Sequence, residues 1–264
     1  MASRTSIIVA ILTLLMAMAL PWRQNAVSSS KPASDTRAVR YEIRFPETNA
    51  YRDAFKQMTR RLYAASGLAG LLDQEGFERS VAAFYNLKKK GLVKRDVLVI
   101  IDYRKPSFQD RLFVIDMKRQ QLKYKSLVAH GKNSGLIRAT RFSNRPGSHM
   151  SSLGVFVTGE TYLGRHGYSL NIHGVERGIN HLAEKRRIVI HGADYVSWRH
   201  IRKYGHLGRS FGCPAVPKRL ARPIIETIKD GSCLVILGND QNYYSKSELY
   251  NLERAALYLA SQET

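Results

Sequence analysis

The sequence predicts a mainly β fold, a mostly antiparallel sandwich or barrel with helices added at both ends. After Gly91, short runs rich in Val, Ile, Leu, Tyr and Phe follow one another, and turn-rich segments such as 132–135 and 144–147 separate them. Runs of this kind are typical of strands. We expect strands at 97–103, 111–116, 122–129, 153–158, 168–172, 187–191 and 233–237. Their number and spacing favour a sandwich or a barrel.

The N-terminus has the pattern of an export signal. Arg4 precedes an apolar run of 14 residues, 7–20, which Pro21 ends. This run is short for a bilayer-spanning helix and has the length of a secretory h-region. We therefore expect residues 1–27 to be a signal peptide or an uncleaved signal anchor, and the chain to be exported to the periplasm or cell envelope.

Two helices are predicted between the signal and the first strand. Residues 28–44 are basic and poor in apolar side chains, which predicts a flexible spacer. Residues 45–92 then form a helical extension, because apolar side chains recur there at steps of three and four residues. The first helix carries Tyr51, Phe55, Met58, Leu62 and Ala65, and the second carries Phe77, Val81, Phe84 and Leu87.

Three further helices and one long loop belong to the rest of the chain. We expect helices at about 178–186 and 217–229 within a β domain that spans 93–240. A C-terminal helix, within 241–264, should begin at the capping box Ser245-x-x-Glu248 and pack on the body. The Ser- and Gly-rich connection 130–154 is longer than a plain connector, which makes it a candidate substrate loop.

The charge balance is strongly basic, with 42 Lys and Arg against 21 Asp and Glu and a net charge of +21. Such a charge favours polyanions or substrates with carboxylates. No nucleic-acid-binding motif accompanies it, so nucleic acid is not an expected partner. For an exported chain, anionic envelope polymers are the possible polyanions, and membrane contact is expected only through an uncleaved N-terminal segment.

One histidine and one cysteine stand at restricted backbone positions. His191 ends the apolar run 188–190 and precedes Gly192, which predicts an imidazole at the end of a buried strand. Cys213 lies between Gly212 and Pro214, and a residue before proline is held extended. A thiol and an imidazole are the minimum equipment for nucleophilic acyl transfer. The structural alternative is a core cysteine and a hydrogen-bonding histidine.

The chain has a second cysteine, so a structural disulfide competes with a nucleophile. Exported proteins meet oxidising conditions, in which Cys213 and Cys233 could pair. Cys233 lies in an apolar run, where a packed free thiol is the more common state. A metal site is not expected, because no H-E-x-x-H or C-x-x-C spacing occurs.

The segments around these residues resemble the murein L,D-transpeptidase catalytic-domain family, a branch of the YkuD-like L,D-transpeptidase group. The resemblance extends over roughly residues 45–240. Its two main segments are I-V-I-H-G-A-D-Y-V-S (188–197) and G-R-S-F-G-C-P-A-V-P (208–217), and others are 96–103, 111–116, 127–135, 142–154 and 158–162. In the wider group the cysteine motif is Ser-His-Gly-Cys, whereas Phe211 stands here in place of its histidine. We interpret this difference as a trait of the branch.

The resemblance implies an L,D-transpeptidase-like fold and a cysteine acyltransferase that acts on peptidoglycan stem peptides. A thioester would form on Cys213, a terminal D-Ala would leave, and an amine would accept the acyl group. The alternatives are a carboxypeptidase or endopeptidase of the same fold, or a non-catalytic cell-wall-binding protein. No cofactor is implied, and we expect a monomer.

Several supporting residues are predicted around the catalytic pair. Backbone N–H groups of Gly212 and Cys213 are candidates for the oxyanion hole. Ser210 would either hydrogen-bond His191 or satisfy its own turn. Arg209 is placed to bind a substrate carboxylate, with a structural ion pair as the alternative. His173 and Tyr162 are candidates for the rim of the substrate cleft. No third residue that orients the imidazole is identified, although Asp194 is close in sequence.

Overall fold

The computed structural model describes residues 47–262. The predicted signal segment 1–27 and spacer 28–44 lie outside the described residues. Among the described helices, none combines the length and the hydropathy that a bilayer-spanning segment needs.

Eight strands form a single sheet in the order β3-β2-β1-β8-β4-β5-β6-β7. Neighbouring strands are antiparallel, except that β1 pairs with β8 and β6 pairs with β7 in parallel. Two isolated bridges, Ala129–Ala215 and Gly131–Ser210, join the chain beyond β3 to the β7 edge. The sheet is therefore a nearly closed barrel, and the predicted mainly β architecture is confirmed. The strands are β1 (Val97–Asp102), β2 (Leu112–Asp116), β3 (Gln121–Ser126), β4 (Gly154–Gly164), β5 (Gly167–Gly174), β6 (Val189–Ala193), β7 (Ala215–Pro217) and β8 (Cys233–Leu237).

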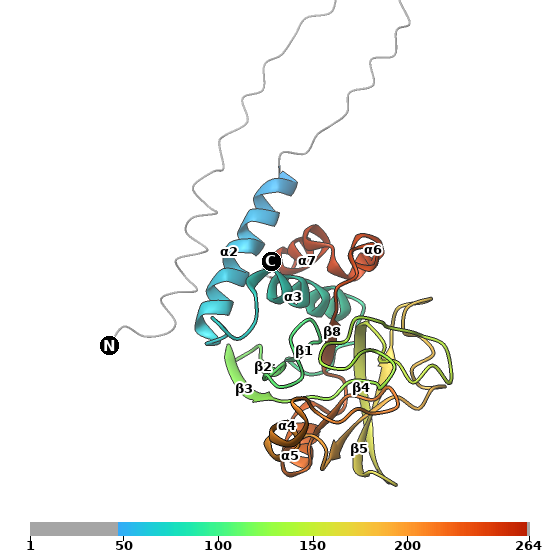
Figure 1. Ribbon diagram of the computed structural model, residues 1–264. Coiled ribbons are helices and arrows are strands. Elements are labelled where there is room, and N and C mark those ends of the chain that lie inside the picture. Colours follow the sequence, from blue (N-terminus) through green and yellow to red (C-terminus); the bar gives the residue numbers. More distant parts are fainter. Residues whose placement is uncertain (1–46, 263–264) are drawn as a thin grey trace, which may run out of the picture. The chain divides into compact units, whose positions relative to one another are not determined.

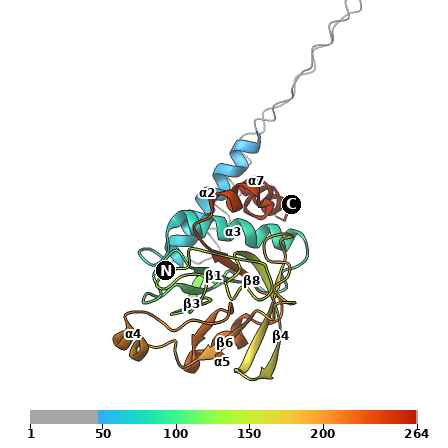
Figure 2. The ribbon, with the colours of Figure 1, turned by 45° about the vertical axis from the view of Figure 1, so that its right-hand side comes forward.

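The helices lie on two sides of this sheet (Figures 1 and 2). One group covers β1 and β8, and α3 contacts both strands. Its members are α2 (Glu47–Ala65), α3 (Gln74–Lys89), α6 (Gln241–Lys246), the short 3-10 helix η1 (Glu248–Tyr250) and α7 (Leu252–Ala260). On the far side, α5 (Lys218–Ile228) packs on β5, β6 and β7, and α4 (Trp198–Tyr204) lies near it.

Strand β1 shows why the sheet is buried on both faces. Leu98 and Ile100 pack in the core cluster shared with α2, α3 and α7. Val99 and Ile101 point the opposite way, into the cluster that α5 completes. Because successive side chains of a strand alternate between faces, a strand with two buried faces must be apolar throughout. This explains the continuous apolar runs at β1 and β8.

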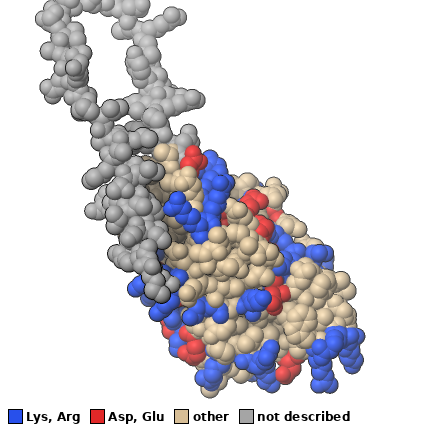
Figure 3. All heavy atoms as spheres, turned by 90° about the vertical axis from the view of Figure 1, so that its left-hand side faces the viewer, with Lys and Arg blue, Asp and Glu red and all other residues tan. Residues whose placement is uncertain are grey.

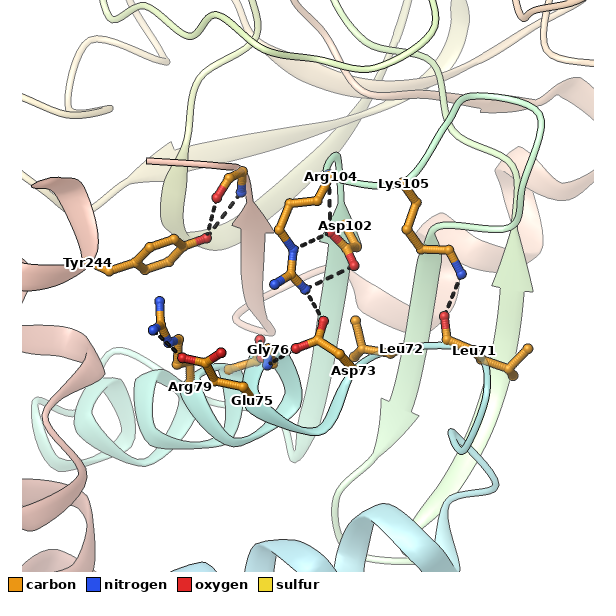
Figure 4. Close-up of polar contacts among 12 residues, drawn as sticks. Leu71, Leu72, Asp73, Glu75, Gly76, Arg79, Asp102, Arg104, Lys105 and Tyr244 are labelled. Atoms are coloured by element: carbon orange, nitrogen blue, oxygen red, sulfur yellow. Dashed lines mark hydrogen bonds and ion pairs between the residues drawn. The ribbon is translucent and has the colours of Figure 1, made fainter. Parts of the chain in front are cut away.

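A polar cluster joins the connection between α2 and α3 to the end of β1 (Figure 4). Arg104 donates from Nε to Asp102 Oδ1 at 2.7 Å and from Nη2 to Asp73, the N-cap residue of α3. Lys105 Nζ donates to the carbonyl of Leu71 at 2.5 Å. The carboxylate of Asp102 is buried, so Arg104 neutralises a charge that the core alone could not hold. The helical extension is thus tied to the sheet by charge as well as by apolar packing.

The two predicted helices of the extension form as α2 and α3, but the helix expected at 178–186 does not form. Residues 177–187 are a succession of turns. The side chain of Asn180 accepts from the backbone N–H of Glu176 and donates to the carbonyls of Leu153 and Val155. A side chain that bonds to backbone groups in this way competes with helix formation.

The other two helix boundaries also differ from the prediction. Helix α5 is found where 217–229 was expected, but the residues just before it, 215–217, form strand β7, which was not predicted. The C-terminal helix α7 is capped by Asn251 and not by Ser245. Ser245 lies inside the separate helix α6, whose cap is Asp240. The capping-box prediction was therefore wrong, because an interruption at 247–251 divides the segment.

The basic side chains are spread over the surface. On the face shown in Figure 3, Lys and Arg lie scattered among neutral residues, with fewer Asp and Glu side chains between them. Scattered positive charge of this kind attracts anions in general, but it does not form a groove that recognises a particular nucleic-acid sequence.

Candidate active site

Cys213 lies immediately before β7, in a backbone conformation that its neighbours impose. Gly212 has φ +128°, which side chains other than glycine rarely adopt, and a Cβ there would lie 2.9 Å from the carbonyl oxygen of Met150. The thiol of Cys213 is half-buried and free. Cys233 is also free and is fully buried in β8. The alternative of a disulfide between the two cysteines is therefore excluded.

His191 lies in the middle of β6 and is buried. Its Nδ1 is 3.0 Å from the carbonyl oxygen of Gly192. A carbonyl can only accept, so Nδ1 carries the proton and Nε2 is the free basic nitrogen. Asp194 does not contact the imidazole, and its carboxylate pairs with Lys218 Nζ at 3.1 Å. A backbone carbonyl therefore orients His191, which explains why no third side chain was evident in the sequence.

The register between β6 and β7 brings these two residues to neighbouring positions. Ala215 lies opposite His191, and Cys213 comes two residues before Ala215. Correspondingly, Val189 lies two residues before His191, and its N–H donates to Cys213 Sγ at 3.4 Å. Two residues of a strand span roughly 7 Å and return to the same face. The candidate nucleophile and base are thus about one strand repeat apart on adjacent strands.

Burial shifts both groups toward their neutral forms. Burial raises the pKa of the Cys213 thiol, while the Val189 N–H and the charges of Arg186 and Arg165 act in the opposite direction. Burial also lowers the pKa of His191, and the nearby His166 and Arg165 lower it further. The hydrogen bond to the Gly192 carbonyl acts in the opposite direction and raises this pKa. At neutral pH the resting site therefore holds a thiol and a neutral imidazole, a pair suited to general-base activation.

The turn between β4 and β5 covers the imidazole. The ring of His166 stacks on that of His191, with centroids 4.4 Å apart and planes 21° apart. Arg165 donates from Nε to His166 Nε2 at 3.0 Å. The sequence analysis did not select either residue. Both residues fall between the strands expected at 153–158 and 168–172, and their position over His191 depends on the pairing of β5 with β6.

A pocket of about 370 Å³ lies next to the turn at Gly212, and neither Cys213 nor His191 is among its lining residues. A Cβ on Gly212 would lie 3.0 Å from Ile188 Cδ1 and 3.4 Å from Arg186 Nη2, which places two of the lining side chains next to Cys213. The long loop 130–154 also contributes to the wall. The lining residues are Gly147, His149, Arg165, Arg186, Ile188 and Phe211.

Ser210 and Gly212 hold the cysteine turn together. Ser210 Oγ donates to the carbonyl of Cys213 at 2.6 Å and accepts from the Gly212 N–H at 3.0 Å. Ser210 therefore bonds its own turn rather than His191. The Gly212 N–H is engaged with a side chain, which leaves the Cys213 N–H as the candidate oxyanion donor.

Arg209, the predicted carboxylate ligand, lies away from the pocket lining. Its Nη1 donates to the carbonyls of Lys132 at 3.1 Å and Gly135 at 3.3 Å, and the side chain is exposed. These two hydrogen bonds hold together the first residues of the loop 130–154. The lining contains Arg165 and Arg186 instead.

Tyr162 and His173 lie on the same face of the sheet as His191 but at different distances. Tyr162 is opposite Ser169, which is in turn opposite His191, so two strand spacings, about 10 Å, separate Tyr162 from His191. Its side chain is exposed at the rim. His173 is four residues further along β5 and faces Glu184, with Nδ1 to Oε2 at 3.5 Å. Neither residue lines the pocket, and Tyr162 lies closer to His191 along the sheet than His173 does.

Among residues 47–262, no group of three His, Cys, Asp or Glu side chains is arranged to hold a metal ion.

Comparison with protein families identifies the chain. Residues 69–237, more than half of the sequence, match the family described as L,D-transpeptidase catalytic domain. The chain belongs to the L,D-transpeptidase catalytic domain family. Cys213 and His191 both lie inside the matched range. No curated protein sequence matches this L,D-transpeptidase family member.

Several solved structures of L,D-transpeptidases resemble this L,D-transpeptidase family member at low similarity. One is an L,D-transpeptidase from Mycobacterium smegmatis, with 12% identity, a TM-score of 0.34, and coverage of 54% of this chain and 59% of that one. Another is LdtMt1 in complex with imipenem, with 10% identity, a TM-score of 0.33, and coverage of 54% and 59%. The chain thus spans about three fifths of the length of these structures. The family assignment rests on the sequence match.

Proposed function

We propose that this protein is an exported cysteine acyltransferase that acts on peptidoglycan stem peptides, with Cys213 as nucleophile and His191 as general base. One observation carries the proposal. In a chain of the L,D-transpeptidase family, the parallel pairing of β6 and β7 supports it, because it puts the free, half-buried thiol of Cys213 about one strand repeat along from the buried imidazole of His191. The export part rests on the apolar run 7–20 behind Arg4.

In the first half-reaction, Cys213 Sγ attacks the carbonyl carbon of a stem peptide bond while His191 Nε2 takes the thiol proton. The negative charge of the tetrahedral intermediate falls on the former carbonyl oxygen, which the Cys213 N–H stabilises. The C–N bond then breaks, and His191 returns the proton to the departing amine of the terminal residue. A thioester on Cys213 remains.

In the second half-reaction, an amine of a neighbouring stem attacks the thioester carbon. His191 accepts the proton of this amine, the C–S bond breaks, and the proton passes to the departing sulfur. A new peptide bond forms, and the enzyme returns to its neutral resting state. Water as acceptor would yield hydrolysis instead, so the nature of the acceptor separates a transpeptidase from a carboxypeptidase.

The experiment is to treat the purified chain with a carbapenem and to weigh the intact protein. We expect one adduct per chain, located on Cys213 by peptide mapping and missing from Cys213→Ala. Cys233→Ala is the matched control, which should label as the wild type does, because Cys233 is fully buried. Wild-type protein that stays unmodified, or label on another residue, would overturn the assignment of the nucleophile.

A second measurement identifies the reaction. Incubation with defined tetrapeptide muropeptides should release one D-Ala per turnover and give cross-linked dimers by mass spectrometry. Tripeptides without dimers would assign the chain as a hydrolase. Equal binding of wild type and Cys213→Ala to sacculi, with no turnover in either, would leave only a wall-binding function.

A further inference from the structure

The pocket next to Cys213 carries positive charge that the described residues leave uncompensated. Arg165 and Arg186 both line it, and none of its lining residues is acidic. Within residues 47–262, neither arginine forms an ion pair with a carboxylate. Two cations facing one cavity without a counter-ion repel each other, and a bound anion relieves that repulsion.

Arg186 is a fixed component of this pocket. Its Nη1 donates to the carbonyl of Ser143 and to Ser152 Oγ, and its Nη2 donates to Met150 O at 2.6 Å and to Ser148 Oγ at 3.2 Å. All four acceptors are neutral and come from the loop 130–154. The guanidinium is thus held in one orientation with its full charge retained, so no side-chain reorganisation is needed when an anion binds.

Arg165 differs because it is exposed and keeps its terminal nitrogens available. Its Nε donates to His166 Nε2, and among residues 47–262 neither Nη1 nor Nη2 has a hydrogen-bond acceptor. Two parallel N–H groups of a guanidinium match the two oxygens of a carboxylate. Arg165 can therefore hydrogen-bond a bound carboxylate directly, and Arg186 adds the electrostatic attraction of a positive charge held in a fixed position.

We propose that this pocket binds a carboxylate of the peptide substrate through Arg165, with the charge of Arg186 behind it, and that this contact selects the peptide bond presented to Cys213. The inference rests on the proposed function and adds the residues that set substrate specificity. In a tetrapeptide stem whose third residue is a diamino dicarboxylic acid, two carboxylates lie near the bond between the third and fourth residues: the C-terminal carboxylate of the leaving fourth residue and the side-chain carboxylate of the third. They share one chemistry, and the experiment separates them.

The test compares three tetrapeptides, namely the free acid, its C-terminal amide and its third-residue side-chain amide, by kcat/KM for release of the fourth residue. Wild type should prefer the free acid over one of the two amides by about tenfold or more, which is typical of a lost hydrogen bond to a charged group. In Arg165→Gln this preference should fall close to one. The amide that loses activity in wild type identifies the carboxylate that is bound.

Two further variants guard against indirect effects. Arg199→Gln removes an exposed arginine of α4 that is outside the pocket lining and should leave the preference unchanged. Arg186→Lys keeps the positive charge but loses the paired Nη1 and Nη2 donors that hold the side chain in place. It should therefore lower kcat/KM for all three peptides and retain some preference for the acid.

The rate of iodoacetamide labelling of Cys213 serves as the reference, because this neutral reagent makes no carboxylate contact. Wild type without an acid preference, or Arg165→Gln with the wild-type preference, overturns the carboxylate pocket even though Cys213 labels and turns over. Failure of wild type to label or to turn over any peptide overturns the proposed function itself. The two failures are therefore distinguishable.

Discussion

His166 and His191 form a stacked pair of imidazoles, with ring centroids 4.4 Å apart, although 24 residues, including the whole of β5, separate them in the chain. The contact places an exposed turn directly on a buried candidate base. Both the burial and the neighbouring imidazole disfavour a positive charge on His191, so its pKa lies below the usual value.

The first prediction concerns this stack. In His166→Ala the pKa of His191 should rise, because the variant admits water to the ring and removes a neighbour that opposes its protonation. An NMR titration of the His191 Hε1 proton measures the change. His173→Ala, whose imidazole faces Glu184, should leave that titration as in wild type. An unchanged His191 midpoint in His166→Ala would show that the stack has no electrostatic effect.

The second prediction concerns the ionisation of the nucleophile. Because burial raises the pKa of Cys213, its thiolate fraction should still be rising with pH at pH 9. The rate of alkylation by iodoacetamide should rise with it. The measurement uses Cys233→Ala, so that a single thiol is followed. A rate that is already level above about pH 7 would indicate a preformed thiolate and imidazolium instead.

The third prediction concerns the polar cluster at the end of β1. Arg104→Ala should destabilise the protein by about 3 kcal/mol, because it leaves the buried carboxylate of Asp102 without a counter-charge. Urea denaturation measures the free energy of unfolding. Arg254→Ala, which breaks an exposed pair with Glu248, should cost less than about 1 kcal/mol.

A double variant distinguishes charge from packing in this cluster. Asp102→Asn combined with Arg104→Ala removes the unpaired charge and should recover part of the loss. If the double variant is no more stable than Arg104→Ala, the arginine acts through packing alone.

The fourth prediction concerns the pH dependence of stability. His130 is buried, accepts from Arg111 Nη2 at Nδ1 over 2.8 Å, and has its pKa lowered to about 3, first by burial and then by Arg111. Below about pH 6.5 the unfolded chain therefore binds a proton that the folded chain does not. Stability should fall as the pH drops from 6.5 toward 3, by up to about 1.4 kcal/mol per pH unit from this residue.

The measurement is urea denaturation at pH 7 and pH 5. Between these values His130→Asn, which can still accept from Arg111, should lose about 2 kcal/mol less than wild type. His181→Asn, a change at an exposed histidine, should reproduce the wild-type difference. Equal pH dependence in wild type and His130→Asn would contradict the assignment.

Local rules were sufficient for much of the fold. Strands β1 and β8 could be predicted because burial on both faces requires continuous runs of apolar residues. Helices α2 and α3 could be predicted because a helix with one buried face has apolar residues at steps of three and four. Strand β7 could not be predicted, because its three residues between Pro214 and α5 are too few to show an alternating hydrophobic pattern. They form a strand through their pairing with β6. The turns at 177–187 escaped prediction because the two carbonyls to which Asn180 donates, those of Leu153 and Val155, lie more than 20 residues away.

The candidate site also combines features that the sequence predicts with features that depend on tertiary contacts. The sequence by itself determined the two candidate catalytic residues, because their neighbours in the chain distinguish them: Pro214 holds the backbone of Cys213 extended, Gly212 permits the tight turn before it, and an apolar run leads to His191. Only the tertiary structure decided the surroundings of the pair, since Arg165 and His166 reach it across a strand pairing and Arg186 through a loop. Charge and burial act through space, and side chains distant in the chain determine them, so no local pattern of residues reveals which groups line the pocket and set the pKa values of Cys213 and His191.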